Sequence, residues 1–220
     1  MYTDASRSFN YDHPALQALL QETLQPGASP REQAVAFYYR VRDGIRYNPY
    51  VFEARSESFS ASDCLQKGES YCIPKAVLLG ALCRGAGIPS RLGLADVKNH
   101  LASPALLEYL RSDVFVMHGY TEIYLEGKWV KATPAFDAAL CQRMGVAALE
   151  FDGLTDSVFQ PYNLKGEQHM EYLAEHGVFE DVPVNFIVQQ VVKAYPHLVA
   201  AALQGNLGQR SLQQDLSAQG

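Results

Sequence analysis

The spacing of apolar residues predicts two helices near the start of the chain. The first runs from Pro14 to Leu24. The second opens at Ser29-Pro30, where Ser29 can cap the helix and proline suits its first position. Apolar residues keep helical spacing along it, at Ala34, Phe37, Tyr38, Val41 and Ile45. We expect both helices to pack together as an N-terminal layer.

A third helical segment, residues 69–84, is apolar around nearly its whole circumference and stops at Gly85-Ala86-Gly87. Such a helix is expected to be enclosed by the rest of the domain. Pro74 is tolerable only in the first turn, because deeper in a helix it removes a backbone hydrogen bond. This places Cys72 at the helix N-terminus. Before it, residues 47–60 predict a loop or irregular strand, and Ser62 can cap a short helix ending at Gly68.

The pattern then changes to strands. We expect strands over 91–97 and 113–125, with a short helix between them from Ser103-Pro104 to Arg111. Glu126-Gly127 predicts a tight turn into a return strand over 128–133, and hence an antiparallel hairpin. Weaker patterns predict a strand at 158–162, a helix at 166–176 and a long helix at 183–203, broken near Pro196. Residues 1–203 are expected to form one domain, followed by a disordered tail at 204–220.

Composition narrows the class of protein. The 220 residues are 48% hydrophobic and 19% charged, which suits a chain with a sizeable core. The net charge of −6 repels phosphate backbones, and no basic cluster is interleaved with aromatic residues, so we expect no nucleic-acid partner. The polar N-terminus and the lack of about 18 consecutive apolar residues predict no export, no membrane association and a cytoplasmic location. Oligomeric state is left open.

The four cysteines are expected to be thiols, because the chain is long for a disulfide scaffold and has no export signal. No C-x-x-C or H-E-x-x-H motif occurs, so we expect neither a metal nor a cofactor. His169 and His176 could share a helix face, but two histidines without a third ligand make a poor metal site. We interpret them as solvated surface residues.

One thiol is placed for chemistry. A helix N-terminus favours the thiolate and lowers the pKa of a cysteine, and Cys72 has that position. Cys83 lies toward the other end of the same helix and is interpreted as core. A nucleophilic thiol also needs an imidazole to take its proton. His118 is the best candidate, because it interrupts an apolar strand and such a polar side chain needs a partner.

Two blocks of sequence resemble the transglutaminase-like family of papain-related cysteine enzymes. The first block comprises Ala81-Leu82-Cys83-Arg84 and Gly87-Ile88-Pro89-Ser90-Arg91, and the second His118, Tyr120, Glu122, Tyr124, Gly127 and Trp129. The resemblance covers about residues 60 to 137. It implies an α+β, papain-like fold, in which N-terminal helices and a buried nucleophile helix pack on an antiparallel sheet. It also implies Cys72 as nucleophile and His118 as general base.

The chain departs from that family at the third catalytic position. An Asp usually stands three residues after the Trp and holds the imidazole in its working tautomer, but here that residue is Ala132. If Glu126-Gly127 is a two-residue loop, His118 faces the neighbourhood of Ala135, and Asp137 lies one diagonal step away. We therefore predict Asp137 as the substitute orienter. The Thr133 hydroxyl, a backbone carbonyl or a distant acidic residue remain alternatives, as does a surface-turn role for Asp137.

Three functions stay open. The first is a thiol enzyme that attacks an amide or peptide carbonyl and forms a thioester at Cys72, resolved by water or by an amine. We favour hydrolysis of a peptide or protein over protein-glutamine amine transfer, because nothing marks a second amine site. The second is a non-catalytic peptide-binding protein, which remains an alternative because Ala132 replaces the usual catalytic Asp. The third is an acyltransferase with a small thioester donor, like the arylamine acetyltransferases. An oxyanion hole would combine the Cys72 N–H with Gln66 or Tyr71.

Overall fold

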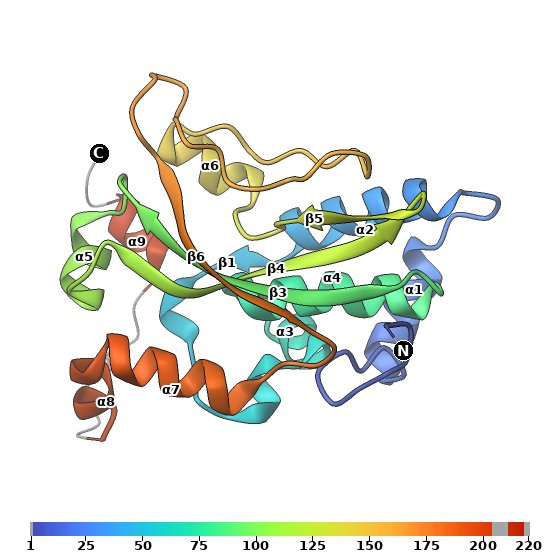
Figure 1. The fold of residues 1–220 in the computed structure, drawn as a ribbon, viewed down its shortest axis with the longest axis horizontal. Coiled ribbons are helices and arrows are strands. Elements are labelled where there is room, and N and C mark those ends of the chain that lie inside the picture. Colours follow the sequence, from blue (N-terminus) through green and yellow to red (C-terminus); the bar gives the residue numbers. More distant parts are fainter. Residues whose placement is uncertain (1, 204–210, 218–220) are drawn as a thin grey trace.

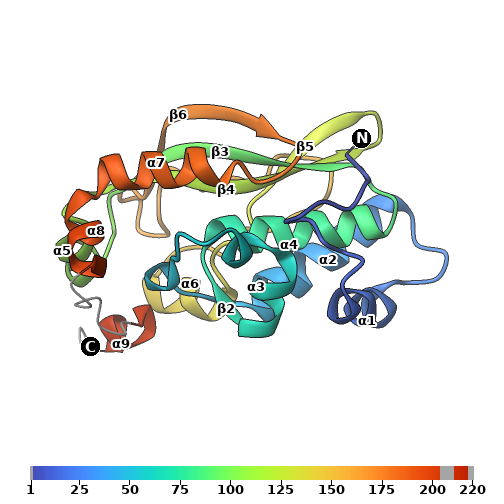
Figure 2. The same cartoon turned by 90° about the horizontal axis from the view of Figure 1, so that it is seen from below.

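A four-stranded antiparallel sheet covered on one face by helices forms the centre of the computed structural model, which describes residues 2–203 and 211–217 (Figure 1). The strands lie in the order β5-β4-β3-β6. Their bounds are β3 Ser90–Asn99, β4 Val114–Leu125, β5 Lys128–Ala132 and β6 Met170–Phe179. Viewed from below, the sheet forms one layer and the N-terminal helices up to residue 85 form another, whereas the helices of residues 184–203 lie at the level of the sheet (Figure 2). The α+β architecture predicted from the sequence is confirmed.

The helical layer contains α1 (Pro14–Thr23), α2 (Pro30–Gly44), α3 (Ala61–Lys67) and α4 (Cys72–Gly85). Local signals set several of their ends. In α2, the Ser29 hydroxyl accepts from the Glu32 N–H at 3.3 Å, and the Glu32 carboxylate accepts from the Ser29 N–H at 2.8 Å. Helix α3 is capped by Ser60 rather than by the predicted Ser62, and it ends at Gly68 in the left-handed conformation.

Helix α4 is the enclosed helix that the sequence predicts. Its residues from Ile73 to Arg84 are buried without interruption. Two charged side chains in this stretch donate hydrogen bonds to backbone oxygens. The Lys75 ammonium donates to the carbonyls of Arg42 and Ile45 at the end of α2, and the Arg84 guanidinium donates to Ser90, Asp4 and Glu180 carbonyls. These contacts fix α4 against its neighbours, because a buried charge without partners is costly.

The two sequence blocks described above meet through Arg91. Its guanidinium forms a 2.6 Å ion pair with Glu122 across the β3–β4 ladder and lies 4.0 Å from the Trp129 ring centroid. Leu125 pairs with Lys128, so Glu126-Gly127 is the predicted two-residue turn, with positive φ at both positions. Arg91 on β3, the strand that follows α4, is therefore held by contacts with the β4–β5 hairpin.

A β-bulge interrupts the pairing of β3 with β4 just before His118. The register shifts between Ala95 and Val97, and Met117 adopts a φ of 59°. A positive φ is uncommon for a residue with a side chain, and here the Met117 N–H donates to the Asp96 carboxylate at 3.0 Å. The bulge sets the direction in which the strand presents the next residue, His118.

The remaining elements are short or lie at the periphery. They are β1 (Arg46–Tyr47), η1 (Pro49–Val51), η2 (Ser56–Phe59), β2 (Glu69–Ser70), α5 (Pro104–Leu110), α6 (Ala138–Met144), α7 (Val184–Ala194), α8 (Pro196–Leu203) and α9 (Leu212–Ser217). The helix predicted at 183–203 is confirmed together with its break, which falls between α7 and α8. Helix α9 lies within the predicted disordered tail, whereas 204–210 and 218–220 lie outside the described residues.

Two weaker predictions are wrong. Residues 166–176 do not form a helix, since Met170–Phe179 pairs with β3 as an edge strand, and long-range pairing overrides the local helix preference. Residues 158–162 form no strand, although Ser157 and Tyr162 make isolated bridges. His169 is buried, and His176 lies 2.9 Å from the Asp96 carboxylate, so the two histidines are not solvated neighbours on a helix.

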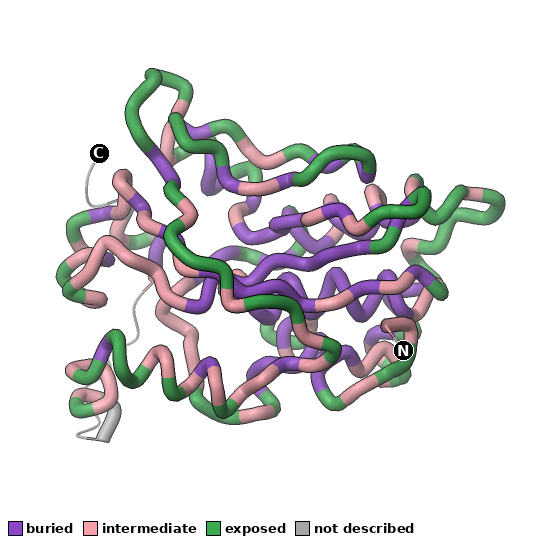
Figure 3. Tube along the Cα trace, in the orientation of Figure 1, coloured by how far each residue is buried: buried purple, intermediate pink, exposed green. Residues whose placement is uncertain are grey.

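Burial follows the two layers. One continuous cluster of buried apolar side chains extends from Phe9 through α4 and the sheet to Ile187 of α7, whereas β6 is largely exposed (Figure 3). Such a cluster fits one domain over 1–203, although that boundary stays a prediction. None of the described helices has the length and apolarity needed to cross a membrane. The cytoplasmic location also stays a prediction.

Candidate active site

Cys72 is the first residue of α4, as predicted, and its surroundings come from two directions. Strand β2 leads directly into the helix and pairs in parallel with β1, which fixes the approach of the chain. On the other side, β4 passes so close that a Cβ on Gly119 would lie 2.8 Å from the Ile73 Cα. Glycine therefore allows the backbone N–H of Gly119 to reach the Cys72 thiol, which the Ile73 N–H also approaches.

The pKa of Cys72 differs from the sequence-based expectation. Burial raises the pKa of the thiol to about 11, and the hydrogen bonds from Gly119 and Ile73 N–H groups only partly offset this effect. The helix N-terminus thus acts in the predicted direction, but desolvation is larger. In the resting protein near pH 7, Cys72 is a neutral thiol, with part of its side chain exposed at the wall of a cavity.

His118 follows the bulge in β4 and is 4% exposed. Its ring centroid lies 4.7 Å from that of Phe159 and 6.3 Å from that of Tyr172. Burial among these rings lowers the pKa of His118 to about 3, so the imidazole is neutral near pH 7. Its Nε2 atom is buried and has no hydrogen-bond partner among the described residues. The partner expected for a polar residue in an apolar strand is therefore missing at this atom.

Asp137 lies in a different hydrogen-bond environment from the one predicted. Its carboxylate accepts from the Leu140 N–H at 2.9 Å, as the N-cap of α6, and from the Tyr47 N–H at 3.3 Å. Among the described contacts, none joins it to His118. The reason is that β5 ends at Ala132, opposite Thr121, so the strand pairing that the prediction extended toward Ala135 does not continue. The chain then turns into α6.

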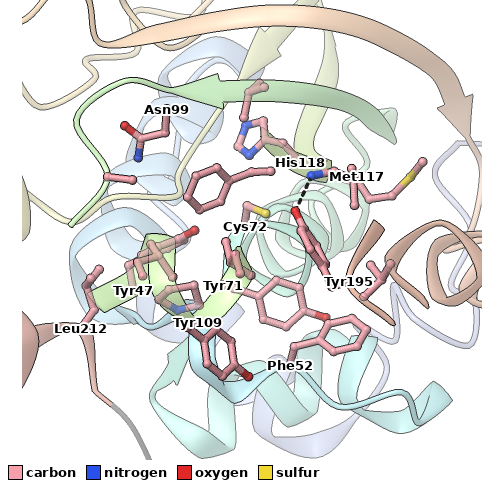
Figure 4. Close-up of a pocket in the computed structure, with 18 of the residues that line it drawn as sticks. Tyr47, Phe52, Tyr71, Cys72, Asn99, Tyr109, Met117, His118, Tyr195 and Leu212 are labelled. Carbon is pink, nitrogen blue, oxygen red and sulfur yellow. Dashed lines mark hydrogen bonds between the residues drawn. The ribbon is translucent and has the colours of Figure 1, made fainter. Parts of the chain in front are cut away.

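Cys72 and His118 line the same cavity, which has a volume of about 660 Å³ (Figure 4). Most of the described residues around it are apolar or aromatic, and its charged lining residues are Glu53 and Arg143. Tyr71 also lines it, is 7% exposed, and has a hydroxyl without a hydrogen-bond partner in the described part of the chain. A pocket of this size with few polar groups is typical of small-molecule sites. Sequence reasoning missed this cavity.

The other residues considered from the sequence lie elsewhere. Gln66 is exposed on α3 and does not line the cavity, so Tyr71 is the better placed of the two side chains considered for an oxyanion hole. No hydrogen bond in the described part of the chain joins Thr133 to His118.

Cys64, Cys83 and Cys141 are buried free thiols whose pKa values are raised by burial. Over residues 2–203 and 211–217, no cluster of three or more His, Cys, Asp or Glu side chains could hold a metal.

Comparisons with solved structures give distant similarities. A proposed cysteine protease from Cytophaga hutchinsonii matches with 16% identity and a TM-score of 0.47, over 81% of this chain and 53% of that protein. A proposed protease from Parabacteroides distasonis ATCC 8503 matches with 14% identity and a TM-score of 0.38, over 59% of this chain and 24% of that protein. The chain therefore spans about half the length of the first protein and about a quarter of the second.

No curated protein matches the chain. The sequence model of the Transglutaminase-like superfamily, however, matches residues 17–134, which is more than half of the 220 residues. The match extends from α1 through the β4–β5 hairpin and includes both Cys72 and His118. It confirms the resemblance seen in the two sequence blocks. The chain belongs to the Transglutaminase-like superfamily.

Proposed function

We propose that the protein is a cysteine-dependent acyl-transfer enzyme that hydrolyses an amide or peptide bond, with Cys72 as nucleophile and His118 as general base. The observation that carries the proposal is that a thiol at a helix N-terminus and a buried imidazole, whose Nε2 has no partner among the described residues, line one cavity. An imidazole nitrogen left without a partner in the resting state is free to take a proton from a neighbouring group. Membership of the superfamily supports the same assignment.

The resting pair is neutral, and this shapes the proposed steps. As the Cys72 sulfur forms a bond to the carbonyl carbon, its proton passes to His118, and the carbonyl electrons move to the oxygen. The backbone N–H groups at the start of α4 and the free Tyr71 hydroxyl are donors available to that oxyanion. The carbon–nitrogen bond then breaks, and His118 protonates the leaving amine. Water, deprotonated by the same imidazole, releases the acid from the thioester.

Asp137 enters this proposal as a positioning residue. Its carboxylate joins the start of α6 to Tyr47, and Tyr47 lines the cavity beside Cys72. Because His118 is held by ring packing with Phe159 and Tyr172, its orientation depends on these rings rather than on a carboxylate. The missing carboxylate contact also favours a second candidate function, a peptide-binding member of the superfamily without catalysis.

Trapping of the acyl-enzyme tests the proposal. Incubation with p-nitrophenyl butyrate should add one butyryl group, which peptide mass mapping should locate on Cys72 because this thiol alone among the four faces the cavity. Water should release the group, and added amines such as glycinamide should not become the main acceptor. Butyryl groups spread over Cys64, Cys83 and Cys141, or none on Cys72, would instead favour the binding function.

Replacement of Asp137 separates its two possible roles. We expect Asp137→Asn to keep the turnover rate within about threefold, because asparagine also caps helices and its side-chain oxygen can still accept from the Leu140 N–H, while the bond from the Tyr47 N–H is lost. Asp137→Ala should lower the free energy of unfolding by about 1 kcal/mol through loss of the cap. Turnover and urea denaturation measure these effects. A loss of about 10²-fold or more in Asp137→Asn at unchanged stability would establish Asp137 as the orienter of the imidazole.

A further inference from the structure

The cavity around Cys72 is far larger than a thiol and an imidazole require. Its volume of about 660 Å³ lies within the range that encloses a small organic ligand. The polar groups without partners, Tyr71 Oη and His118 Nε2, belong to residues that flank Cys72 in the cavity wall. The rest of the lining is mainly apolar, so burial of an apolar group is the main source of binding free energy that it offers.

Much of the apolar wall comes from elements outside the stretch matched by the superfamily. Residues of α7, α8 and the residue between them line the cavity, namely Val188, Val191, Val192, Tyr195, Leu198 and Val199. The end of α7 is tied to the catalytic strand, since the Tyr195 hydroxyl donates to the Val114 carbonyl at 2.6 Å and accepts from the Val116 N–H at 3.1 Å. These helices therefore add an apolar wall to the part of the fold matched by the superfamily model, on the strand that carries His118.

Helix α5 supplies a second part of this wall, through Leu106, Tyr109 and Leu110. The Tyr109 ring stacks edge-on against Tyr50 with centroids 4.9 Å apart. The Tyr71 ring is likewise in contact with Phe52, at 5.7 Å between centroids. These pairs make a rigid aromatic surface, because each ring is held by another ring rather than by solvent.

The geometry also indicates which side of the scissile bond occupies this surface. Figure 4 shows His118 on one side of Cys72, and Tyr71, Tyr109 and Phe52 on the other. The leaving amine must depart toward His118, which protonates it. The acyl group, which stays bonded to Cys72 until water releases it, therefore extends toward the aromatic rings.

We infer that the substrate is an amide whose acyl part is a large apolar group, of about the size of an octanoyl chain, and that α5, α7 and α8 select it. This inference rests on the proposed function of Cys72. Val191, on the cavity side of α7, and Gln189, exposed and absent from the lining, offer a matched pair of variants on one helix.

A series of p-nitrophenyl esters tests the inference, because the leaving group stays constant while the acyl group grows from acetyl through butyryl and hexanoyl to octanoyl. We expect the second-order rate of Cys72 acylation to rise by at least about 30-fold from acetyl to octanoyl, as each buried CH₂ adds up to about 0.8 kcal/mol. Val191→Trp should remove this preference by lowering the octanoyl rate toward the acetyl rate, because the indole fills space that a long chain would occupy. Gln189→Trp should behave as the unmodified protein.

Equal rates for all four esters, or equal behaviour of Val191→Trp and Gln189→Trp, would overturn the inference while leaving the proposed function intact. If no ester acylates Cys72, calorimetry on Cys72→Ala decides the question with octanamide, acetamide and N-octylacetamide as probes. Tighter binding of octanamide than of the other two, lost in the Val191→Trp background, would support the apolar acyl site without catalysis. Tighter binding of N-octylacetamide, or no binding of octanamide, would overturn it.

Discussion

Replacing Cys72 with alanine is expected to lower the rate of p-nitrophenyl butyrate hydrolysis by at least about 10³-fold, the scale seen when a covalent nucleophile is removed. Alanine keeps the helix and the neighbouring N–H groups but leaves no atom that can form the thioester. Cys72→Ser should lose a comparable factor, because an alcohol is a much weaker nucleophile than a thiol beside the same imidazole. Release of p-nitrophenol measures the rate.

The matched control for this prediction lies on the same helix. Cys83 is fully buried in α4 and does not line the cavity, so Cys83→Ala removes a thiol without touching the proposed chemistry. It should retain the rate within about twofold and lose roughly 1 kcal/mol of stability, as small core truncations do. Similar rates for Cys72→Ala and the unmodified protein would refute the assignment of the nucleophile. An equal loss in Cys83→Ala would attribute the effect to damage of the helix.

Local signals explain why so much of the helical layer could be predicted. The Ser29–Glu32 capping box, the apolar circumference of α4 and the need to keep Pro74 in the first turn are all encoded within a few residues. They place Cys72 without any knowledge of the sheet. The Glu126-Gly127 turn acts in the same way for the β4–β5 hairpin, where short-range chemistry fixes the register.

Long-range contacts explain what sequence reasoning could not supply. Strand β6 exists because its backbone pairs with β3, about 80 residues earlier in the chain, and its own sequence gives a weak signal. Strand β5 ends at Ala132, and Asp137 caps α6 and bonds to the Tyr47 N–H instead of His118, which the hairpin alone does not predict. The cavity is equally non-local, since its wall combines α4, β4, α5, α7 and α8.

The pKa of Cys72 illustrates the same limit for electrostatics. The position of a thiol in a helix can be read from sequence, and its dipole effect has a known sign. How deeply side chains from other elements bury the thiol cannot be predicted from sequence, and burial has the larger effect on the pKa of Cys72. Cys72 should therefore owe its reactivity to the proton transfer to His118 once a substrate is bound, not to a thiolate present in the resting protein.

His118 gives the second large expected effect, which is on stability in acid. Its pKa is lowered by burial to about 3 in the folded protein, against 6.5 as the ordinary value. Between pH 6.5 and 3, His118 therefore binds a proton in the unfolded chain but not in the folded protein. The contribution of neutral His118 is fully present above pH 6.5 and is lost as the pH falls toward 3. At 1.36 kcal/mol per pKa unit, the loss amounts to roughly 4 to 5 kcal/mol.

Replacing His118 with phenylalanine should remove this acid sensitivity, because the new ring can pack against Phe159 and Tyr172 without titrating. Urea unfolding at pH 7, 5 and 4 measures it: the free energy of unfolding should fall less steeply for His118→Phe than for the unmodified protein. Cys72→Ala is the control, since it keeps the buried imidazole and its thiol is protonated in both states below pH 7, so its slope should match the unmodified protein. If the free energy of unfolding fell equally with pH in all three proteins, His118 would not be buried in its neutral form. That result would also refute the neutral Cys72–His118 pair.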